Sequence, residues 1–253
     1  MDVFWTLPPV SRTIAAAAVV VSALGYAQII DLFQFIYLPQ YVLTVSAVPQ
    51  IWRIVTAFFI TKPKFGIIMD PYFVYMYGSG LERESARFSQ PGDFFVYTVF
   101  VGSLIVALAG HILGGVTFLA ALSLAYAYTY AQDNPTRQVT LFIITFDAKF
   151  LPFALLFMTL ILDGPDQAMT QATGLLAAHM FDFLTRIWPT FGGGTNFIVT
   201  PMFVRRWFGD KPGVQQARSY GFAQRGGGAA AAEPGSSGRS TGSQWGPGRR
   251  LGD

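Results

Sequence analysis

Six long runs of apolar residues constrain this chain more than any other feature of its sequence. Each run carries few or no charged side chains, and the whole chain is 52% hydrophobic and only 12% charged. A soluble domain carries roughly 25% charged residues, so about half of the usual water-facing surface is missing. Runs of this length and composition are typical of helices that cross a bilayer. The sequence therefore predicts an all-α membrane protein, a bundle of six spans, rather than one or two soluble domains.

The six predicted spans are separated by loops that contain turn-forming pairs. The spans cover about residues 14–32, 67–81, 94–112, 116–131, 150–162 and 168–188, with an alternative start of the fifth near Leu141. Pro-Gly, Gly-Gly, Asn-Pro and Gly-Pro pairs lie between the later spans and favour turns. Asp70-Pro71 indicates the start of the second helix, because a proline in the first turn leaves no N–H unpaired. Residues 39–60 are interpreted as an interfacial loop with short amphipathic pieces.

The first two runs each carry a further question. The first has an alternative interpretation as a cleaved signal peptide, since small residues occur at Gly25 and Ala27. Its apolar core exceeds the usual ~7–15 residues and only Arg12 precedes it, which favours a retained span. The second run has about 15 apolar residues, or roughly 22 Å of helix against a hydrocarbon core of roughly 30 Å. Thinning of the surrounding bilayer would accommodate so short a span.

Lysine and arginine indicate the orientation of the chain in the membrane. With the N-terminus in the cytosol, one loop on the far side receives Arg53, Lys62 and Lys64. The cytosolic side receives Arg12, Arg83, Arg87, Arg137, Lys149, Arg186, Arg205 and Arg206. Because cytosolic loops are enriched in positive charge, this distribution predicts both termini in the cytosol and an even number of spans.

Residue types exclude several classes of chemistry. The chain has no cysteine and two histidines, which excludes disulfides, thiolate nucleophiles and Cys-type zinc sites and disfavours a multi-histidine metal site. No cofactor or metal is therefore expected. The net charge of +3 does not imply nucleic acid as a partner, because much of the excess lies in the C-terminal residues.

His179 is the residue whose position most suggests chemistry. It lies within the sixth predicted span, and an ionisable residue at that depth is a functional hypothesis by default. In rhomboid proteases such a histidine is the base of a Ser–His dyad, but the Gly-x-Ser-Gly turn of the nucleophile does not occur here, and Ser123 lies about two turns deeper. A base without a nucleophile performs no acyl transfer. We therefore favour a histidine that hydrogen-bonds between helices, with Gly174 and Ala178 as a small-xxx-small packing pair. Asp182 and Arg186 are predicted to form an i,i+4 ion pair.

The C-terminal residues have a different composition from the rest. Residues 209–253 are rich in Gly, Ala, Ser, Pro and Arg, which predicts a disordered tail following a transmembrane domain of residues 1–208. Within the tail, residues 245–252 place two apolar anchors, Trp245 and Leu251, around Gly246 and Gly248. Glycines let the backbone lie close to a partner while the anchors fill pockets, so the segment is interpreted as a short binding motif.

Taken together, these features resemble the Derlin family, which is a rhomboid-like family of pseudoproteases, over nearly the whole chain. The family's Trp-Arg motif falls on Trp52 and Arg53, and its Gly-x-x-x-Gly motif falls on Gly174 and Ala178, where the second glycine is replaced. The C-terminal motif resembles the SHP box. Further similarity lies in Trp5 with Pro8, Gln50-Ile51-Trp52-Arg53, residues 174–179, residues 196–201 and Arg206-Trp207.

The resemblance implies a six-span rhomboid-like bundle in the endoplasmic reticulum membrane that lacks enzymatic activity. It would act in endoplasmic-reticulum-associated degradation, thinning the bilayer for misfolded lumenal or membrane proteins. Trp52 and Arg53 would contact clients or lipid, and the tail would recruit the Cdc48/valosin-containing-protein AAA ATPase. A membrane ubiquitin ligase complex is a further implied partner. Two alternatives stay open: an active intramembrane serine protease of the rhomboid type, and a small membrane transporter or channel.

Overall fold

The computed structural model describes residues 6–42, 48–63, 66–141, 144–192 and 198–209. The chain divides into two units, Met1–Pro212 and Gly213–Asp253, and every helix and strand described lies in the first unit. The predicted tail from residue 210 onward, including Trp245, Gly246, Gly248 and Leu251, lies outside the described residues, as do Trp5, Lys64 and residues 196 and 197.

The described residues are mostly helical, as predicted. The main helices are α2 (Pro9–Tyr26), α5 (Gly66–Glu84), α6 (Asp93–Ile105), α7 (Leu119–Asp133), α8 (Leu151–Leu162) and α9 (Pro165–Asp182). Two of them continue as π-helical turns, α6 into η2 (Val106–Ile112) and α9 into η4 (Phe183–Ile187). The short elements are η1 (Leu32–Gln34), α3 (Pro39–Val42), α4 (Trp52–Thr56), β1 (Gln138–Leu141), β2 (Ile144–Asp147), η3 (Ala148–Phe150), α10 (Trp188–Phe191) and α11 (Met202–Trp207).

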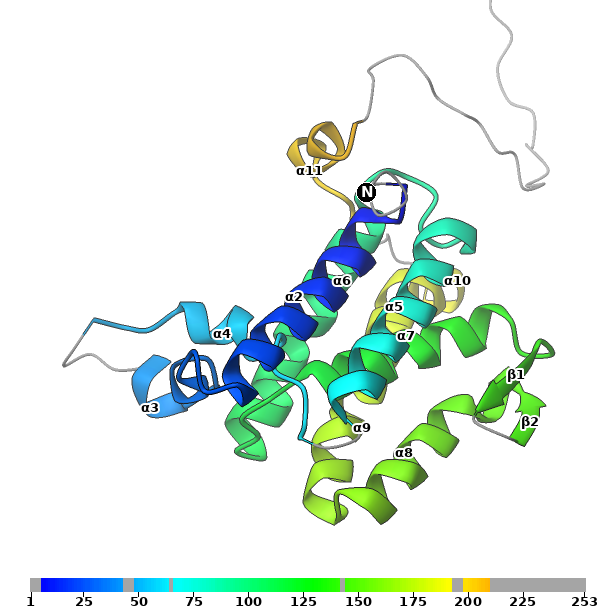
Figure 1. The fold of residues 1–253 in the computed structure, drawn as a ribbon. Helices are drawn as coiled ribbons and strands as arrows, with labels where there is room; N and C mark the ends of the chain where they lie inside the picture. The colour runs from blue at the N-terminus through cyan, green and yellow to red at the C-terminus, as the bar shows by residue number, and fades with distance from the viewer. Residues whose placement is uncertain (1–5, 43–47, 64–65, 142–143, 193–197, 210–253) are drawn as a thin grey trace, which may run out of the picture. The chain divides into compact units, whose positions relative to one another are not determined.

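Helix α7 forms the centre of the helical bundle. All but one of its residues from Leu119 to Ala131 are buried. Helices α5, α6, α8 and α9 all contact α7, and α2 packs on the outer side of α5 (Figure 1). Small side chains of α7, such as Ala121 and Ala125, let the neighbouring helices approach closely. Tyr126 of α7 is fully buried, and its hydroxyl has an internal hydrogen-bond partner in the Thr98 hydroxyl at 2.8 Å.

Each of the six main helices overlaps one of the six predicted apolar runs, but their ends differ. Helix α2 begins at Pro9 and ends at Tyr26, before the predicted limit at residue 32. Its start is fixed by Glu82 of α5, whose carboxylate accepts hydrogen bonds from the backbone N–H groups of Val10 and Ser11 and from the Ser11 hydroxyl. A carboxylate favours a helix N-terminus because it satisfies orphan N–H groups and opposes the positive end of the dipole.

The predicted start of the second helix is wrong. Helix α5 begins at Gly66, so Pro71 lies inside it. The helix has 19 residues, which is longer than its apolar run. Extending the helix by a turn before Pro71 costs little, because only one intrahelical hydrogen bond is missing, the one that proline has no N–H to donate.

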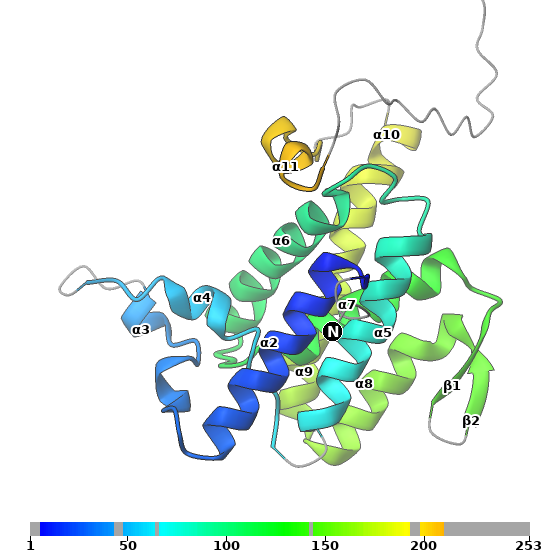
Figure 2. The same cartoon turned by 45° about the horizontal axis from the view of Figure 1, so that its top comes forward.

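A β-hairpin between α7 and α8 is a further difference from the sequence-based expectation. Strands β1 and β2 pair antiparallel, with Val139 opposite Phe146 and Thr140 opposite Thr145. The fifth helix therefore starts at Leu151 and not near Leu141. Alternating residues with β-branched and aromatic side chains, such as Val139, Thr140 and Phe146, favour a strand over a helix. Figures 1 and 2 show the hairpin beside the end of α7 and the start of α8.

Apolar side chains on the outside of the bundle indicate the solvent it is built for. Two helices among the described residues, Pro9–Tyr26 and Asp93–Ile112, are long and apolar enough to cross a membrane, and Ala148–Leu162 is a shorter apolar helix. Only 33% and 28% of the residues in the two long segments are buried. On α8, Phe153, Phe157 and Ile161 are each more than 60% exposed. A soluble protein rarely exposes so continuous an apolar surface, whereas a lipid environment favours it.

Candidate functional site

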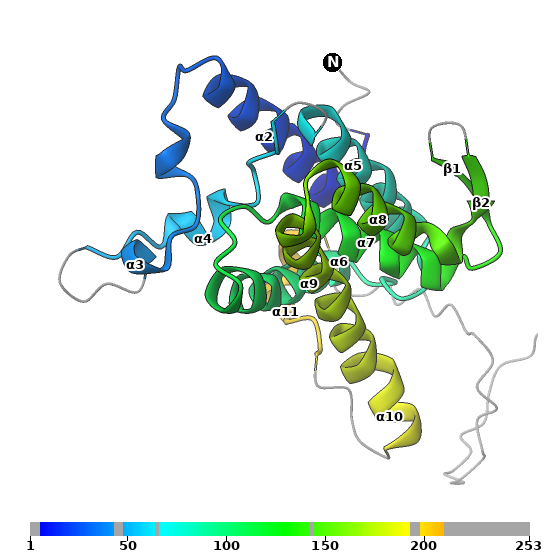
Figure 3. The same ribbon diagram turned by 90° about the horizontal axis from the view of Figure 1, so that it is seen from below.

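The Trp-Arg pair of the interfacial loop separates into one exposed and one buried residue. Both lie at the start of α4, which Figures 1 and 3 show near α3. Trp52 is 52% exposed, and its neighbours Ile51 and Val55 are also exposed. Arg53 is only 3% exposed. An apolar surface that can contact lipid or a client therefore includes Trp52 but not the Arg53 guanidinium.

Arg53 holds the preceding loop segment in place. Its Nη1 donates to the carbonyl oxygens of Phe33 (2.6 Å) and Ile36 (2.9 Å), and its Nε donates to Gln50 Oε1 (2.5 Å). The guanidinium also lies over the rings of Phe33 and Tyr41, 5.6 and 5.1 Å from their centroids. These contacts connect η1, α3 and α4. The predicted role of Arg53 in client handling stays a prediction, and its geometry adds a structural role.

We expect Arg53→Ala to destabilise the protein by about 2–3 kcal/mol, because it removes a buried guanidinium that donates to two backbone carbonyl groups. Trp52→Ala is the matched control at the adjacent position and should leave the free energy of unfolding within about 0.5 kcal/mol, since the side chain is exposed. Thermal unfolding of the purified variants measures both changes. If Arg53→Ala unfolds at the wild-type temperature while client turnover falls, Arg53 acts on clients and not on the loop.

The small residues of the sixth helix bring α9 against α7. Gly174 faces the backbone of α7 so closely that a Cβ atom built on it would lie 1.8 Å from the carbonyl oxygen of Ala121. Ala178, one turn further along α9, is 1% exposed. Replacing the second glycine of the family motif by alanine is therefore compatible with close packing, because the closest approach occurs at Gly174.

His179 and Ser123 lie in different environments. His179 is on an exposed side of α9, and its Nδ1 is 2.9 Å from the hydroxyl of Tyr128 on α7. Ser123 is buried inside α7 and donates to the carbonyl oxygen of Ala120 over 2.8 Å. Within the described part of the chain, no hydrogen bond joins the two residues. The arrangement therefore links two helices through a histidine and offers no activated serine.

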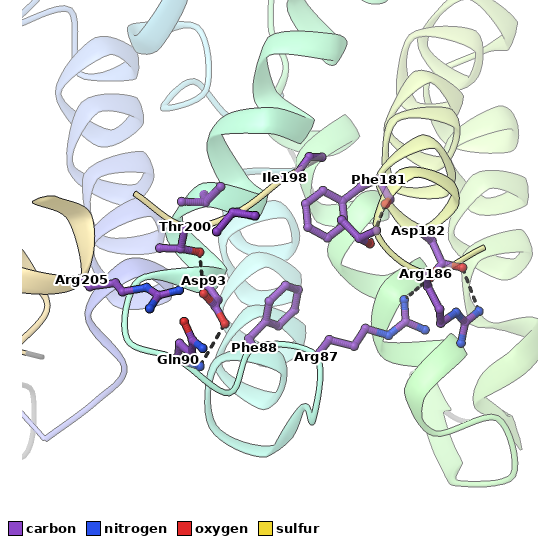
Figure 4. Close-up of a pocket in the computed structure, with 13 residues that line it drawn as sticks. Arg87, Phe88, Gln90, Asp93, Phe181, Asp182, Arg186, Ile198, Thr200 and Arg205 are labelled. Atoms are coloured by element: carbon purple, nitrogen blue, oxygen red, sulfur yellow. Dashed lines mark hydrogen bonds and ion pairs between the residues drawn. The ribbon is translucent and has the colours of Figure 1, made fainter. Parts of the chain in front are cut away.

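A cavity of about 390 Å³ lies at the end of the bundle where α6 begins and α9 ends (Figure 4). Its wall includes three arginines from separate segments, Arg87, Arg186 and Arg205, and two carboxylates, Asp93 and Asp182. Figure 4 shows Arg87 and Arg186 on either side of Asp182, with Phe88 and Phe181 between them and Asp93. We refer to it as the arginine cavity.

Asp182 is the centre of an ion-pair network beside the arginine cavity. Its side chain is 5% exposed and accepts from Arg87 Nη1 (2.6 Å) and Arg186 Nη2 (2.8 Å). The predicted pair of Asp182 with Arg186 is thus present. Arg87 also pairs with Asp133 at the end of α7, which in turn accepts from the hydroxyl of Ser85. The network joins the loop after α5 to the ends of α7 and α9. Nothing local in the sequence indicates that Arg87 has partners 46 and 95 residues away, so the sequence placed it only on the cytosolic side.

The segment before α11 is attached to the other side of the arginine cavity. Asp93 accepts from Thr200 Oγ1 (2.5 Å) and from the backbone N–H of Gln90 (2.9 Å). Gly92 has a φ of 87°, and a Cβ on it would lie 2.7 Å from Val204 Cγ1. Glycine therefore permits both the turn into α6 and the close approach of α11.

These sites hold the bundle together and present surfaces, and none of them assembles a nucleophile with a base. Among the described residues there is no group of three or more His, Asp or Glu side chains placed to hold a metal ion. A mostly helical fold with apolar side chains facing outward and an ion-pair network at the ends of α7 and α9 is typical of a helical membrane protein.

Comparison with known proteins agrees with this class. A model of the Der1-like family matches residues 7–202, and the chain belongs to the Der1-like family. It is 30% identical to Derlin-1 of Bos taurus and to Derlin-1 of Mus musculus, and each alignment covers 100% of this chain and 98% of the relative. Derlin-1 of Drosophila melanogaster is 26% identical over 82% of this chain and 84% of the fly protein.

Proposed function

We propose that this protein is a non-enzymatic scaffold of the endoplasmic reticulum membrane that acts in endoplasmic-reticulum-associated degradation. The observation that carries the proposal is the match to Derlin-1 proteins along 100% of the chain, which includes the C-terminal residues as well as the helices. The internal bonding of Ser123 and the pairing of His179 with Tyr128 support a scaffold over a rhomboid-type protease.

In this proposal all six main helices cross the membrane, with both termini in the cytosol. Helix α8, whose apolar side chains face outward, has 12 residues, or about 18 Å at 1.5 Å per residue. It is shorter than a hydrocarbon core of roughly 30 Å, which supports local thinning of the bilayer. A misfolded lumenal or membrane protein would then cross with a smaller desolvation cost. The exposed surface of α4 around Trp52 would contact clients or lipid.

The tail from Gly209 would recruit the Cdc48/valosin-containing-protein ATPase, which pulls the client from the cytosol, and a membrane ubiquitin ligase complex would act beside it. Trp245 and Leu251 are the proposed anchors, and Gly246 and Gly248 allow the backbone to lie against the ATPase. A short segment that orders on binding loses conformational entropy, so its affinity alone is modest.

We expect a peptide of residues 242–253 to bind the ATPase with a Kd of micromolar order, roughly −8 kcal/mol. In the full-length protein, Trp245→Ala combined with Leu251→Ala should abolish ATPase recovery, because both anchor pockets are left empty. Arg239→Ala, outside the motif, is the control and should recover as much ATPase as the wild type. Recovery by affinity capture from detergent measures the effect. Equal recovery with the doubly substituted protein would remove the recruiting role while leaving family membership intact.

A further inference from the structure

Backbone groups on the outer edge of strand β1 have no backbone partner among the residues that the structure describes. The backbone N–H of Ala148 donates to the carbonyl of Arg137, so these two residues form a hydrogen-bonded pair of the antiparallel ladder. Because antiparallel pairs alternate, Val139 and Leu141 then direct their backbone groups toward β2, and Gln138 and Thr140 direct theirs outward. No backbone hydrogen bond among the described residues reaches this outward edge.

A groove runs along the same edge. It has a volume of about 500 Å³, and its lining includes β1 residues but no residue of β2. The opposite wall is formed by α5 and the end of α7, through Met69, Tyr72, Phe73, Met76, Tyr77 and Tyr130. Tyr72 and Met76 are 50% and 51% exposed. The groove therefore combines a row of backbone hydrogen-bonding groups on one side with aromatic and apolar side chains on the other.

The hairpin is held in this position by one of its faces. Val139, Leu141 and Phe146 are partly buried and pack against the core, whereas Thr140 and Thr145 bond to each other over 3.0 Å on the outer face. An uncovered strand edge is a site for pairing with another extended chain, and folded proteins usually block such edges. Here α5 leaves room beside the edge.

We infer that the groove between β1 and α5 binds an extended segment of unfolded polypeptide by strand addition to β1. The segment would pair with Gln138 and Thr140 and place alternate apolar side chains against Tyr72 and Met76. An unfolded chain that enters apolar surroundings must satisfy every backbone N–H and C=O, and the free edge supplies partners for them. The occupant is chosen by this hydrogen-bonding complementarity, which neither a lipid tail nor a folded helix possesses. The inference rests on the proposed function, because the natural occupant of the groove would be a misfolded client protein.

Two proline substitutions test the inference directly. Thr140→Pro removes an outward N–H from β1, and Thr145→Pro removes the equivalent outward N–H from β2, on the side away from the groove. Both substitutions lose the same threonine–threonine hydrogen bond. The pair therefore matches the cost to the hairpin and differs only in which edge is blocked.

The probe is a fluorescent ten-residue peptide of alternating valine and threonine with lysine at both ends. Its binding to the full-length protein in lipid nanodiscs is followed by anisotropy. We expect Thr140→Pro to weaken binding by about tenfold or more and Thr145→Pro to leave it unchanged, the difference corresponding to about 1.4 kcal/mol. Two further peptides carry N-methyl groups on either the odd or the even residues, which blocks one edge of the peptide at a time. Only one of the two should lose binding, because only one edge of the peptide pairs with β1.

The inference would be overturned by equal weakening by both prolines, by binding that is indifferent to N-methylation, or by photo-crosslinks from the peptide that avoid α5 and β1. A crosslink at Thr140 that captures lipid or a second copy of the chain in place of the peptide would also overturn it. The assay contains no ATPase and no degradation step. Normal peptide binding in a protein that does not support degradation would therefore contradict only the proposed function.

Discussion

Replacing Gly174 by alanine is expected to destabilise the protein by about 3 kcal/mol, at the upper end of the cost of overpacking. The added Cβ would lie 1.8 Å from the carbonyl oxygen of Ala121, and a backbone atom cannot move aside as a side-chain end can. Helices α7 and α9 must therefore separate, which disturbs the buried centre of the bundle. Alanine is otherwise the better helix former by about 1 kcal/mol, so a net loss reflects the contact alone.

Gly102→Ala is the control for this change. Gly102 also lies inside a predicted span, but a Cβ there would meet only Phe58 at 3.5 Å, an ordinary contact. We expect this variant to be as stable as the wild type or slightly more so. Thermal unfolding in one detergent compares the two. If both glycines tolerate alanine equally, the approach of α9 to α7 is looser than the structure shows.

Removing Arg87 should have an effect of similar size. The Arg87→Ala variant leaves Asp182, with its side chain only 5% exposed, and Asp133 without their shared cation. Breaking a buried ion pair by deleting one partner costs about 3–5 kcal/mol, because the remaining charge is left uncompensated. The ends of α7 and α9 and the loop after α5 then lose their common attachment.

Arg137→Ala provides the comparison for a pair of the same chemistry. Arg137 and Glu84 form an ion pair whose side chains are 52% and 61% exposed, for which about 0–1 kcal/mol is expected. Denaturant titration of both variants measures the difference. A loss of less than about 1 kcal/mol for Arg87→Ala would show that Arg186 alone neutralises Asp182. If the pair does contribute, the variant with both Asp182→Asn and Arg87→Ala should lose less free energy of unfolding than the sum of the two single losses, since the two residues share one interaction.

The positions of the main helices could be predicted because each depends on its own residues. An apolar run without charges has to form a helix in lipid, since only internal hydrogen bonds satisfy its backbone. The turns at Gly92, Gly114 and Gly164 followed from local chemistry, and all three glycines have positive φ. The pairing of Asp182 with Arg186 was predicted for the same reason, because four residues along a helix bring two side chains together.

The parts that could not be predicted depend on distant residues. Glu82 fixes the start of α2 from more than 70 positions away. The hairpin could not be predicted because a short apolar stretch is ambiguous between strand and helix, and packing of Val139 and Phe146 on the core decides for the strand. The sequence placed Arg53 in an interfacial loop, whereas hydrogen bonds to two backbone carbonyls of the preceding segment hold its side chain inside.

The sequence by itself determined the class of this protein, the order of its helices, the resemblance that the family match confirms, and the lack of a nucleophile motif. All of these follow from composition, periodicity or local motifs. Only the tertiary structure decided which member of the Trp-Arg pair is buried, that Gly174 meets the backbone of α7, that Asp182 is shared by two arginines, and that β1 leaves an edge open beside α5. Each of those depends on three-dimensional distances between segments, and a linear sequence does not contain such distances until the helices have packed.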